Sequence, residues 1–135
     1  MIQAKDIMQT GLITVTEQTS VHDAISILAE KKITGLPVVD ETGALVGIVS
    51  EKDILLMAYR EITDTCDEAM KSRKITDVMT SKVVSFRPED NLADICQCFM
   101  NKSFRRVPVL DNGKLVGIIS RKDIVAHAFA KLSQV

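Results

Sequence analysis

The sequence has few aromatic residues and no excess of one sign of charge, and both shortages exclude classes of function. Its 135 residues include four Phe, one Tyr and no Trp, which argues against a platform for stacking single-stranded nucleic acid bases. The formal net charge is −1, so there is no bulk electrostatic attraction to nucleic acid or to an anionic membrane. We therefore expect neither nucleic acid nor a membrane among the partners.

Long apolar runs and paired cysteines are missing as well. No apolar run approaches the roughly 18 residues that a membrane-spanning helix needs. The first residues, MIQAKDIMQTG, lack the apolar core of a signal peptide, so the expected location is the cytoplasm. The three cysteines, Cys66, Cys96 and Cys98, have no spacing typical of a disulfide framework, which favours reduced structural thiols.

What the sequence does contain is a tandem repeat. LPVVDETGALVGIVSEKDIL at 36–55 aligns with VPVLDNGKLVGIISRKDIV at 107–125, with a shorter turn in the second copy. The alignment continues upstream, where Asp6-Ile7-Met8 matches Asp77-Val78-Met79. From this repeat we assign residues 1–62 to a first domain, 63–74 to a linker and 75–135 to a second domain.

The sequence pattern of each copy predicts a short β-prone piece, an amphipathic helix, a hairpin and a second helix. The β-prone pieces are 12–15 and 83–86. The first helices have apolar residues at helical spacing, Val21, Ala24, Ile25 and Leu28 in one copy and Leu92, Ile95, Cys96 and Phe99 in the other. Asp-Asn-Gly between two apolar runs is a strong hairpin signal. The second helices are expected to begin at Asp53 and Asp123. A unit of roughly 60 residues has a marginal core by itself, so we expect the two copies to pack sheet against sheet.

Each copy closes on the same short motif, GIVSEKD at 47–53 and GIISRKD at 117–123. Between a strand and a helix, Ser-x-x-Asp resembles a capping box, and an Asp in the first turn suits the helix dipole. The motif also fits a ligand site, because a helix N-terminus binds phosphate and a Gly within a strand often marks the close approach of a ligand or backbone. A short carboxylate in both copies suits the vicinal hydroxyls of a ribose. The sequence therefore allows both interpretations of the motif, as a helix cap and as a ligand site.

The copies differ most at the entrance to the hairpin. Arg105-Arg106 precede VPVLD, whereas Thr34-Gly35 stand at the matching place in the first copy. Arginine suits bidentate contacts with phosphate, and a solvated pair at a strand entrance is an equal explanation. His22 and His127 have no partners at catalytic or metal-ligand spacing, so we expect neither an enzyme nor a metal site.

Together these motifs resemble the CBS domain, named after cystathionine beta-synthase, and the chain resembles a free-standing CBS pair, or Bateman module. The resemblance covers essentially all of the chain and rests on Asp-h-Met (h, aliphatic), h-Pro-Val-h-Asp, Gly-x-Leu-Val-Gly-Ile-h and Ser-x-x-Asp. It implies an α+β fold of tandem βαββα repeats with pseudo-twofold symmetry, in which the sheets pack together and the helices lie outside.

The resemblance also implies two clefts for adenosine-type ligands such as AMP, ADP, ATP or S-adenosylmethionine, in a non-catalytic regulatory module. The family's ribose-binding Asp matches Asp53 and Asp123, and its Ser or Thr matches Ser50 and Ser120. Residues that often contact phosphate or base match Thr34, Gly35, Arg105 and Arg106. Each cleft takes an early strand of the opposite repeat, which implies Leu12, Ile13, Thr14 and Ile33 beside Asp123, and Lys82, Val83, Val84 and Phe104 beside Asp53.

The arginine pair predicts unequal clefts, with Ser120, Asp123, Arg105 and Arg106 forming the better site for a phosphorylated nucleotide. The family implies no catalytic cofactor, and Mg²⁺ only where it accompanies a polyphosphate. It implies a homodimer, for which Met57 and Tyr59 are candidate contacts, and a separate regulated protein as a further partner. The alternative is a structural or interaction dimer with vestigial clefts, in which Ser50 and Ser120 serve only as caps.

Overall fold

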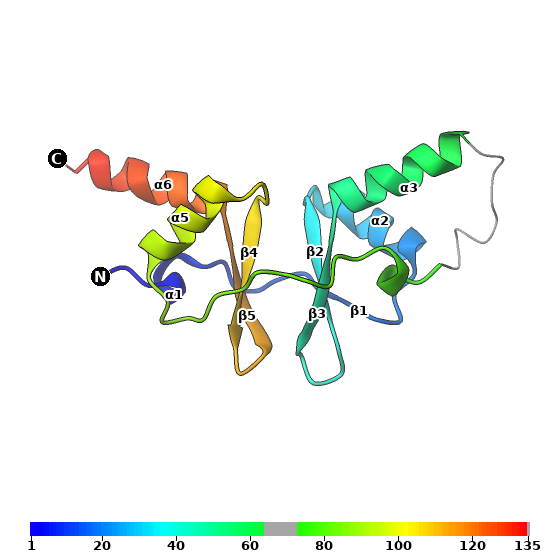
Figure 1. Ribbon diagram of the computed structural model, residues 1–135, viewed down its shortest axis with the longest axis horizontal. Coiled ribbons are helices and arrows are strands. Elements are labelled where there is room, and N and C mark those ends of the chain that lie inside the picture. The colour runs from blue at the N-terminus through cyan, green and yellow to red at the C-terminus, as the bar shows by residue number, and fades with distance from the viewer. Residues whose placement is uncertain (64–72, 135) are drawn as a thin grey trace. The chain divides into compact units, whose positions relative to one another are not determined.

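The chain forms two compact units, shown in Figure 1 by a computed structural model that describes residues 1–63 and 73–134. The Asp53 unit consists of Ile13–Val83, and the Asp123 unit combines Met1–Leu12 with Val84–Val135. These units differ from the sequence repeats, because the start of each repeat packs with the hairpin of the other repeat. Most of the linker assigned to 63–74 lies outside the described residues.

A small mixed sheet is the centre of the Asp53 unit. Strand β1 (Val15–Thr16) runs parallel to β2 (Gly35–Val39), which pairs antiparallel with β3 (Leu45–Ser50). Helix α2 (Val21–Lys31) connects β1 to β2, and α3 (Glu51–Thr63) follows β3 directly. The short helix η1 (Ile75–Asp77) leads to Thr80, which forms an antiparallel bridge with Ile48 at the free edge of β3.

The Asp123 unit repeats this arrangement with residues from both ends of the chain. Its hairpin is β4 (Arg106–Asp111) paired antiparallel with β5 (Lys114–Ser120). Phe86 bridges β4 in parallel, and Gln9 bridges the outer edge of β5 at Ile118. The helices of this unit are α1 (Ala4–Ile7), α5 (Leu92–Asn101) and α6 (Arg121–Leu132).

The helices and hairpins that the sequence predicts are confirmed, with three local corrections. The second helices begin at Glu51 and Arg121 instead of at the Asp, because the preceding Ser is the cap. Of the β-prone pieces 12–15 and 83–86, the described strands and bridges include only Val15 and Phe86. The remainder lies where the chain passes from one unit to the other. Ile25 is 38% exposed, and Ile27 packs against the core instead.

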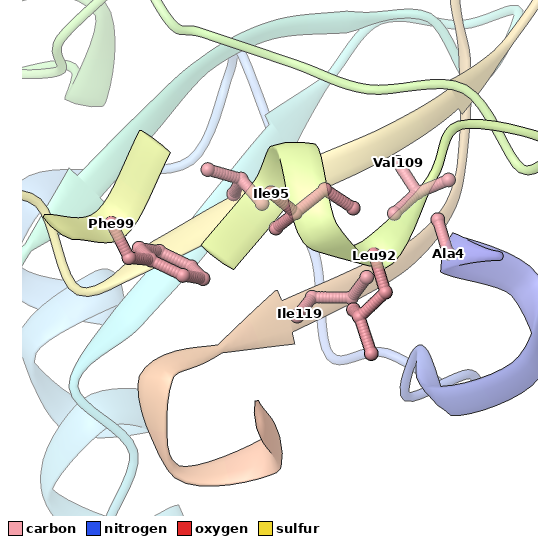
Figure 2. Packing of buried hydrophobic residues seen from close by; sticks show 7 residues of the cluster. Ala4, Leu92, Ile95, Phe99, Val109 and Ile119 are labelled. Atoms are coloured by element: carbon pink, nitrogen blue, oxygen red, sulfur yellow. The ribbon is translucent and has the colours of Figure 1, made fainter. Parts of the chain in front are cut away.

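Each unit has its own apolar core, made where one face of a helix meets the hairpin. In the Asp123 unit, α5 turns Leu92, Ile95 and Phe99 toward the hairpin residues Val109 and Ile119, as Figure 2 shows. Ala4 of α1 is fully buried in the same cluster. Full burial of a Leu, Ile, Val or Phe side chain contributes about 1.5–3 kcal/mol, so these contacts stabilise the unit. The matching cluster of the Asp53 unit contains Val15, Ala24, Leu28, Leu36, Val38, Val49 and Ile75.

The hairpin turns differ in length and in the way they are held. Asn112 and Gly113 both have positive φ angles, 52° and 80°, as a tight two-residue turn requires. The longer turn after β2 is organised by Asp40, whose Oδ1 accepts hydrogen bonds from the Thr42 hydroxyl at 2.7 Å and the Thr42 N–H at 2.9 Å. The hydrogen bond from the Thr42 hydroxyl lowers the pKa of the Asp40 carboxyl below its usual value, and the bond from the Thr42 N–H lowers this pKa to a smaller extent.

The two glycines within the strands make room for methionine side chains. A Cβ atom on Gly117 would lie 2.7 Å from Cγ of Met8, and one on Gly47 would lie 2.6 Å from Sδ of Met79. The sequence interpretation expected a ligand or backbone to approach these glycines. The Met of the Asp-h-Met motif fills the space at both, and at Gly47 the Thr80 carbonyl oxygen also lies close, at 2.9 Å. The glycines therefore serve the fold and are no longer an argument for a ligand.

We predict that Gly117→Ala destabilises the protein by about 1–3 kcal/mol, the usual effect of adding a methyl group to a filled space. Chemical denaturation of the full chain measures the change. The matched test is Met8→Ala in the Gly117→Ala background, because the smaller side chain makes room for the new methyl group. The double variant should then be more stable than the sum of the single effects implies. Strictly additive effects would contradict this packing.

Candidate functional site

Both Ser-x-x-Asp motifs form the reciprocal bonds of a helix cap. The Ser120 N–H donates to Asp123 Oδ2 at 2.8 Å, and the Asp123 N–H donates to Ser120 Oγ at 3.3 Å. The same bonds join Ser50 and Asp53 at 2.9 and 3.3 Å, and the Ser50 hydroxyl also donates to Asp53 Oδ2 at 3.0 Å. The cap interpretation is therefore confirmed. Because the cap fixes one oxygen of each carboxylate, it also fixes the direction of the other.

The second carboxylate oxygen contacts a residue that the sequence interpretation missed. Nε2 of Gln9 donates to Asp123 Oδ1 at 2.8 Å. In the Asp53 unit, the Thr80 hydroxyl faces Asp53 Oδ1 at 3.5 Å, which is long for a hydroxyl donor. An ionised carboxylate has about four acceptor positions. These bonds use two of them at Asp123 and three at Asp53, which leaves two and one for the hydroxyl groups of a ligand. A sequence signal existed, since Gln9 and Thr80 each directly follow the aligned Met of Asp-h-Met.

Backbone pairing explains why Gln9 and Thr80 lie beside these carboxylates. Gln9 exchanges two backbone hydrogen bonds with Ile118, at 2.8 and 3.0 Å, along the outer edge of β5. Thr80 exchanges two with Ile48, both at 2.9 Å. Each pairing lies next to the glycine that accommodates the methionine. The absence of a side chain at Gly117 therefore positions the residue that contacts Asp123.

Strand register also brings the hairpin entrance next to the Ser of each motif. Arg106 pairs with Ser120 across the β4–β5 hairpin, and Gly35 pairs with Ser50 across β2–β3. The backbone bonds just outside the hairpins match as well: Thr34 O accepts from the Glu51 N–H at 3.0 Å, and Arg105 O accepts from the Arg121 N–H at 3.0 Å. The Asp123 unit thus combines Ser120 and Asp123 with the arginine pair, and the Asp53 unit combines Ser50 and Asp53 with Thr34-Gly35.

The residues expected from the opposite repeats divide between the two units. Leu12 belongs to the Asp123 unit, and Lys82 and Val83 belong to the Asp53 unit, each with the Asp to which the resemblance assigned it. Ile13, Thr14 and Ile33 belong to the Asp53 unit, and Val84 and Phe104 to the Asp123 unit. The cleft roles of all these residues stay predictions. Phe104 has a contact of its own, an edge-to-face arrangement with Phe99 at 6.2 Å between ring centroids.

Among the described residues, no helix is both long and apolar enough to cross a membrane. The cytoplasmic location stays a prediction. The structure describes two free cysteines, Cys96 and Cys98, both half-buried on α5, and Cys66 lies outside the described residues.

Known proteins share both the sequence repeat and the fold. The chain is 36% identical over 136 residues to CBSX2, a chloroplastic CBS domain-containing protein of Arabidopsis thaliana, covering 84% of this chain and 57% of CBSX2. It is 33% identical over 125 residues to YlbB of Bacillus subtilis, covering 92% of this chain and 80% of that protein. The chain therefore spans little more than half the length of CBSX2.

Two of the similar solved structures contain bound nucleosides or nucleotides. The structure of CBSX2 in complex with AMP has a TM-score of 0.82 and 36% identity, and the match covers 96% of this chain and 98% of that one. The CBS domain pair of protein MJ0100, in complex with 5′-methylthioadenosine and S-adenosyl-L-methionine, has a TM-score of 0.78 and 28% identity. That match also covers 96% of this chain and 98% of the other chain.

The family model for the CBS domain matches twice, at residues 4–59 and 75–129. These two matches contain both Ser-x-x-Asp motifs, both Asp-h-Met motifs and both hairpins. The chain belongs to the CBS-domain family, with two CBS domains in tandem.

Proposed function

We propose that this CBS pair is a non-catalytic regulatory module that binds adenosine-type ligands at Asp53 and Asp123. The observation that carries the proposal is the pair of carboxylates that are fixed in the same way at the start of α3 and α6. The bound AMP of CBSX2 and the bound S-adenosyl-L-methionine of the MJ0100 pair support this class of ligand. AMP, ADP, ATP and S-adenosylmethionine are all candidates.

In this proposal, the ribose and the phosphate of such a ligand each have a matching group in the Asp123 unit. The Asp123 carboxylate accepts hydrogen bonds from the two ribose hydroxyls, while Arg105 and Arg106 supply positive charge for phosphate. Thr34 and Gly35 supply no charge in the Asp53 unit, so we propose that the Asp123 site prefers phosphorylated ligands. We propose that Mg²⁺ binds only where it accompanies a polyphosphate. Binding regulates a separate protein if that protein has different affinities for the ligand-bound and ligand-free states.

A homodimer is part of the proposal, and exposed apolar residues on α3 and α6 support it. On α3 these are Leu55, Leu56, Tyr59 and Ile62, and on α6 they are Val125, Phe129 and Leu132, all more than half exposed. A second copy with twofold symmetry would cover such faces. Met57, which the sequence interpretation also assigned to a dimer contact, is only 2% exposed and packs within its own chain.

The second candidate function is a structural or interaction dimer with vestigial ligand sites. The complete capping boxes favour it, because they give Ser50, Asp53, Ser120 and Asp123 a role that needs no ligand. The two functions predict different responses to nucleotides. Ligand at 100 times its Kd stabilises a binding protein by about 2.7 kcal/mol, whereas the structural dimer shows no thermal shift.

We predict that Asp123→Ala weakens AMP binding at least several-fold in titration calorimetry, because the ribose hydroxyls lose their acceptor. Asp123→Asn is the companion variant, since its side-chain oxygen can still accept from the Ser120 N–H while the negative charge is removed. Asp94→Ala, which removes an exposed first-turn carboxylate of α5, is the control and should bind like the wild type. Unchanged AMP affinity in both Asp123 variants would contradict the site assignment.

We predict that Phe129→Glu converts the dimer to a monomer in analytical ultracentrifugation, because it introduces a charge into the apolar face of α6. The matched control is Met100→Glu on α5, whose side chain is similarly exposed, at 78% compared with 72% for Phe129. That variant should stay dimeric. A wild-type chain that is monomeric at tens of micromolar would overturn the homodimer.

A further inference from the structure

Arg121 is the first residue of α6, where its charge is unfavourable for that helix. A helix N-terminus carries partial positive charge, so it favours acidic side chains and disfavours basic ones. The other repeat follows this rule, since Glu51 occupies the matching first position of α3. The positive charge at the start of α6 therefore calls for an explanation outside this helix.

The Arg121 side chain binds the end of a different helix. Its Nη2 donates to the carbonyl oxygens of Lys102 at 2.9 Å and Phe99 at 3.3 Å, and its Nε donates to that of Phe104 at 3.1 Å. Phe99 lies in the last turn of α5, and Lys102 is the residue that caps its C-terminus. The last carbonyl groups of a helix lack partners within the helix, and a cation there is favourable. Arg121 thus joins the start of α6 to the end of α5.

The segment that Arg121 holds leads directly to the arginine pair. Three side-chain bonds end on Phe99, Lys102 and Phe104, and the Arg121 N–H donates to the carbonyl oxygen of the next residue, Arg105. Arg106 then begins β4 and pairs with Ser120, the residue that precedes Arg121. The guanidinium is planar and carries its donors in a fixed arrangement, so these bonds restrain the segment in more than one direction.

In the Asp53 unit, Glu51 stands at the position of Arg121, so this position carries no guanidinium group. Helix α2 is capped by Lys32 in the left-handed conformation, with φ of 52°, and the Ile33 N–H donates to the Leu28 carbonyl oxygen at 3.3 Å. The backbone bond from Glu51 to Thr34 is the counterpart of that from Arg121 to Arg105. Within the described part of the chain, guanidinium bonds of this kind occur in the repeat that carries Arg105 and Arg106.

We propose that Arg121 is a positioning residue for phosphate recognition, which holds the segment 102–105 so that Arg105 and Arg106 stand beside the Asp123 carboxylate. This inference rests on the proposed function of the Asp123 site. Arg121 acts through the segment that it restrains and not through contact with the ligand. Its loss should therefore lower the affinity for ligands that carry a phosphate group and leave the affinity for other ligands unchanged. Asp123, by contrast, is proposed to bind the ribose, so its substitution should lower the affinity for both classes of ligand.

The test compares AMP with adenosine by titration calorimetry on the full chain. In the wild type we expect AMP to bind more tightly than adenosine. Arg121→Ala should reduce AMP affinity roughly tenfold, the equivalent of one charge-assisted hydrogen bond, and change adenosine affinity less than twofold. Arg121→Lys should recover part of the loss, because an ammonium group can still donate to these carbonyl groups. Asp123→Ala should weaken both ligands.

The control is Lys122→Ala, which removes an exposed positive charge from the same turn of α6. It should leave the ratio of AMP to adenosine affinities unchanged. Equal weakening of both ligands by Arg121→Ala, or an equal loss of AMP affinity in the Lys122 variant, would overturn the positioning role. If Arg121→Ala fails to fold, AMP and adenosine affinities are compared in Arg121→Lys instead. A ratio of AMP to adenosine affinity equal to that of the wild type would then overturn the positioning role. A wild-type chain that binds neither ligand would refute the proposed function itself.

Discussion

The fit of a methionine side chain over a glycine is the contact on which the candidate sites depend. Met8 lies over Gly117 and Met79 lies over Gly47, so the start of each repeat can approach the outer strand of a hairpin. Backbone bonds to Ile118 and Ile48 then complete the edge of each sheet. Because these bonds place Gln9 and Thr80, the packing of two apolar side chains determines what the Asp carboxylates contact.

The candidate sites combine structural and binding roles in the same atoms. One oxygen of each Asp is held by the backbone at a helix start, and the other is turned toward the edge segment. A cap and a ligand site are therefore not exclusive, since the cap gives the carboxylate a fixed direction before a ligand arrives. Such preorganisation reduces the conformational entropy that binding would otherwise remove.

The sequence was sufficient for features that depend on neighbouring residues. Asp-Asn-Gly predicted a hairpin, and the helical spacing of Leu92, Ile95 and Phe99 predicted a buried face. It was not sufficient for contacts between distant segments. Gln9 and Asp123 are separated by 114 positions, and no periodicity relates them. The sequence also could not predict the three carbonyl groups bound by Arg121, because every residue has a backbone carbonyl and the residue type does not show which one is bound.

The exchange of starting segments also limits where such a chain can be divided. A cut at the repeat boundary would separate Met8 from Gly117 and leave both hairpins with a bare outer strand, an edge prone to pairing with other chains. A fragment of residues 13–83 retains the segment that pairs with its own β3, and it begins within one repeat and ends within the next. Each repeat therefore depends on the other for a complete sheet, since it supplies an edge segment for a sheet other than its own.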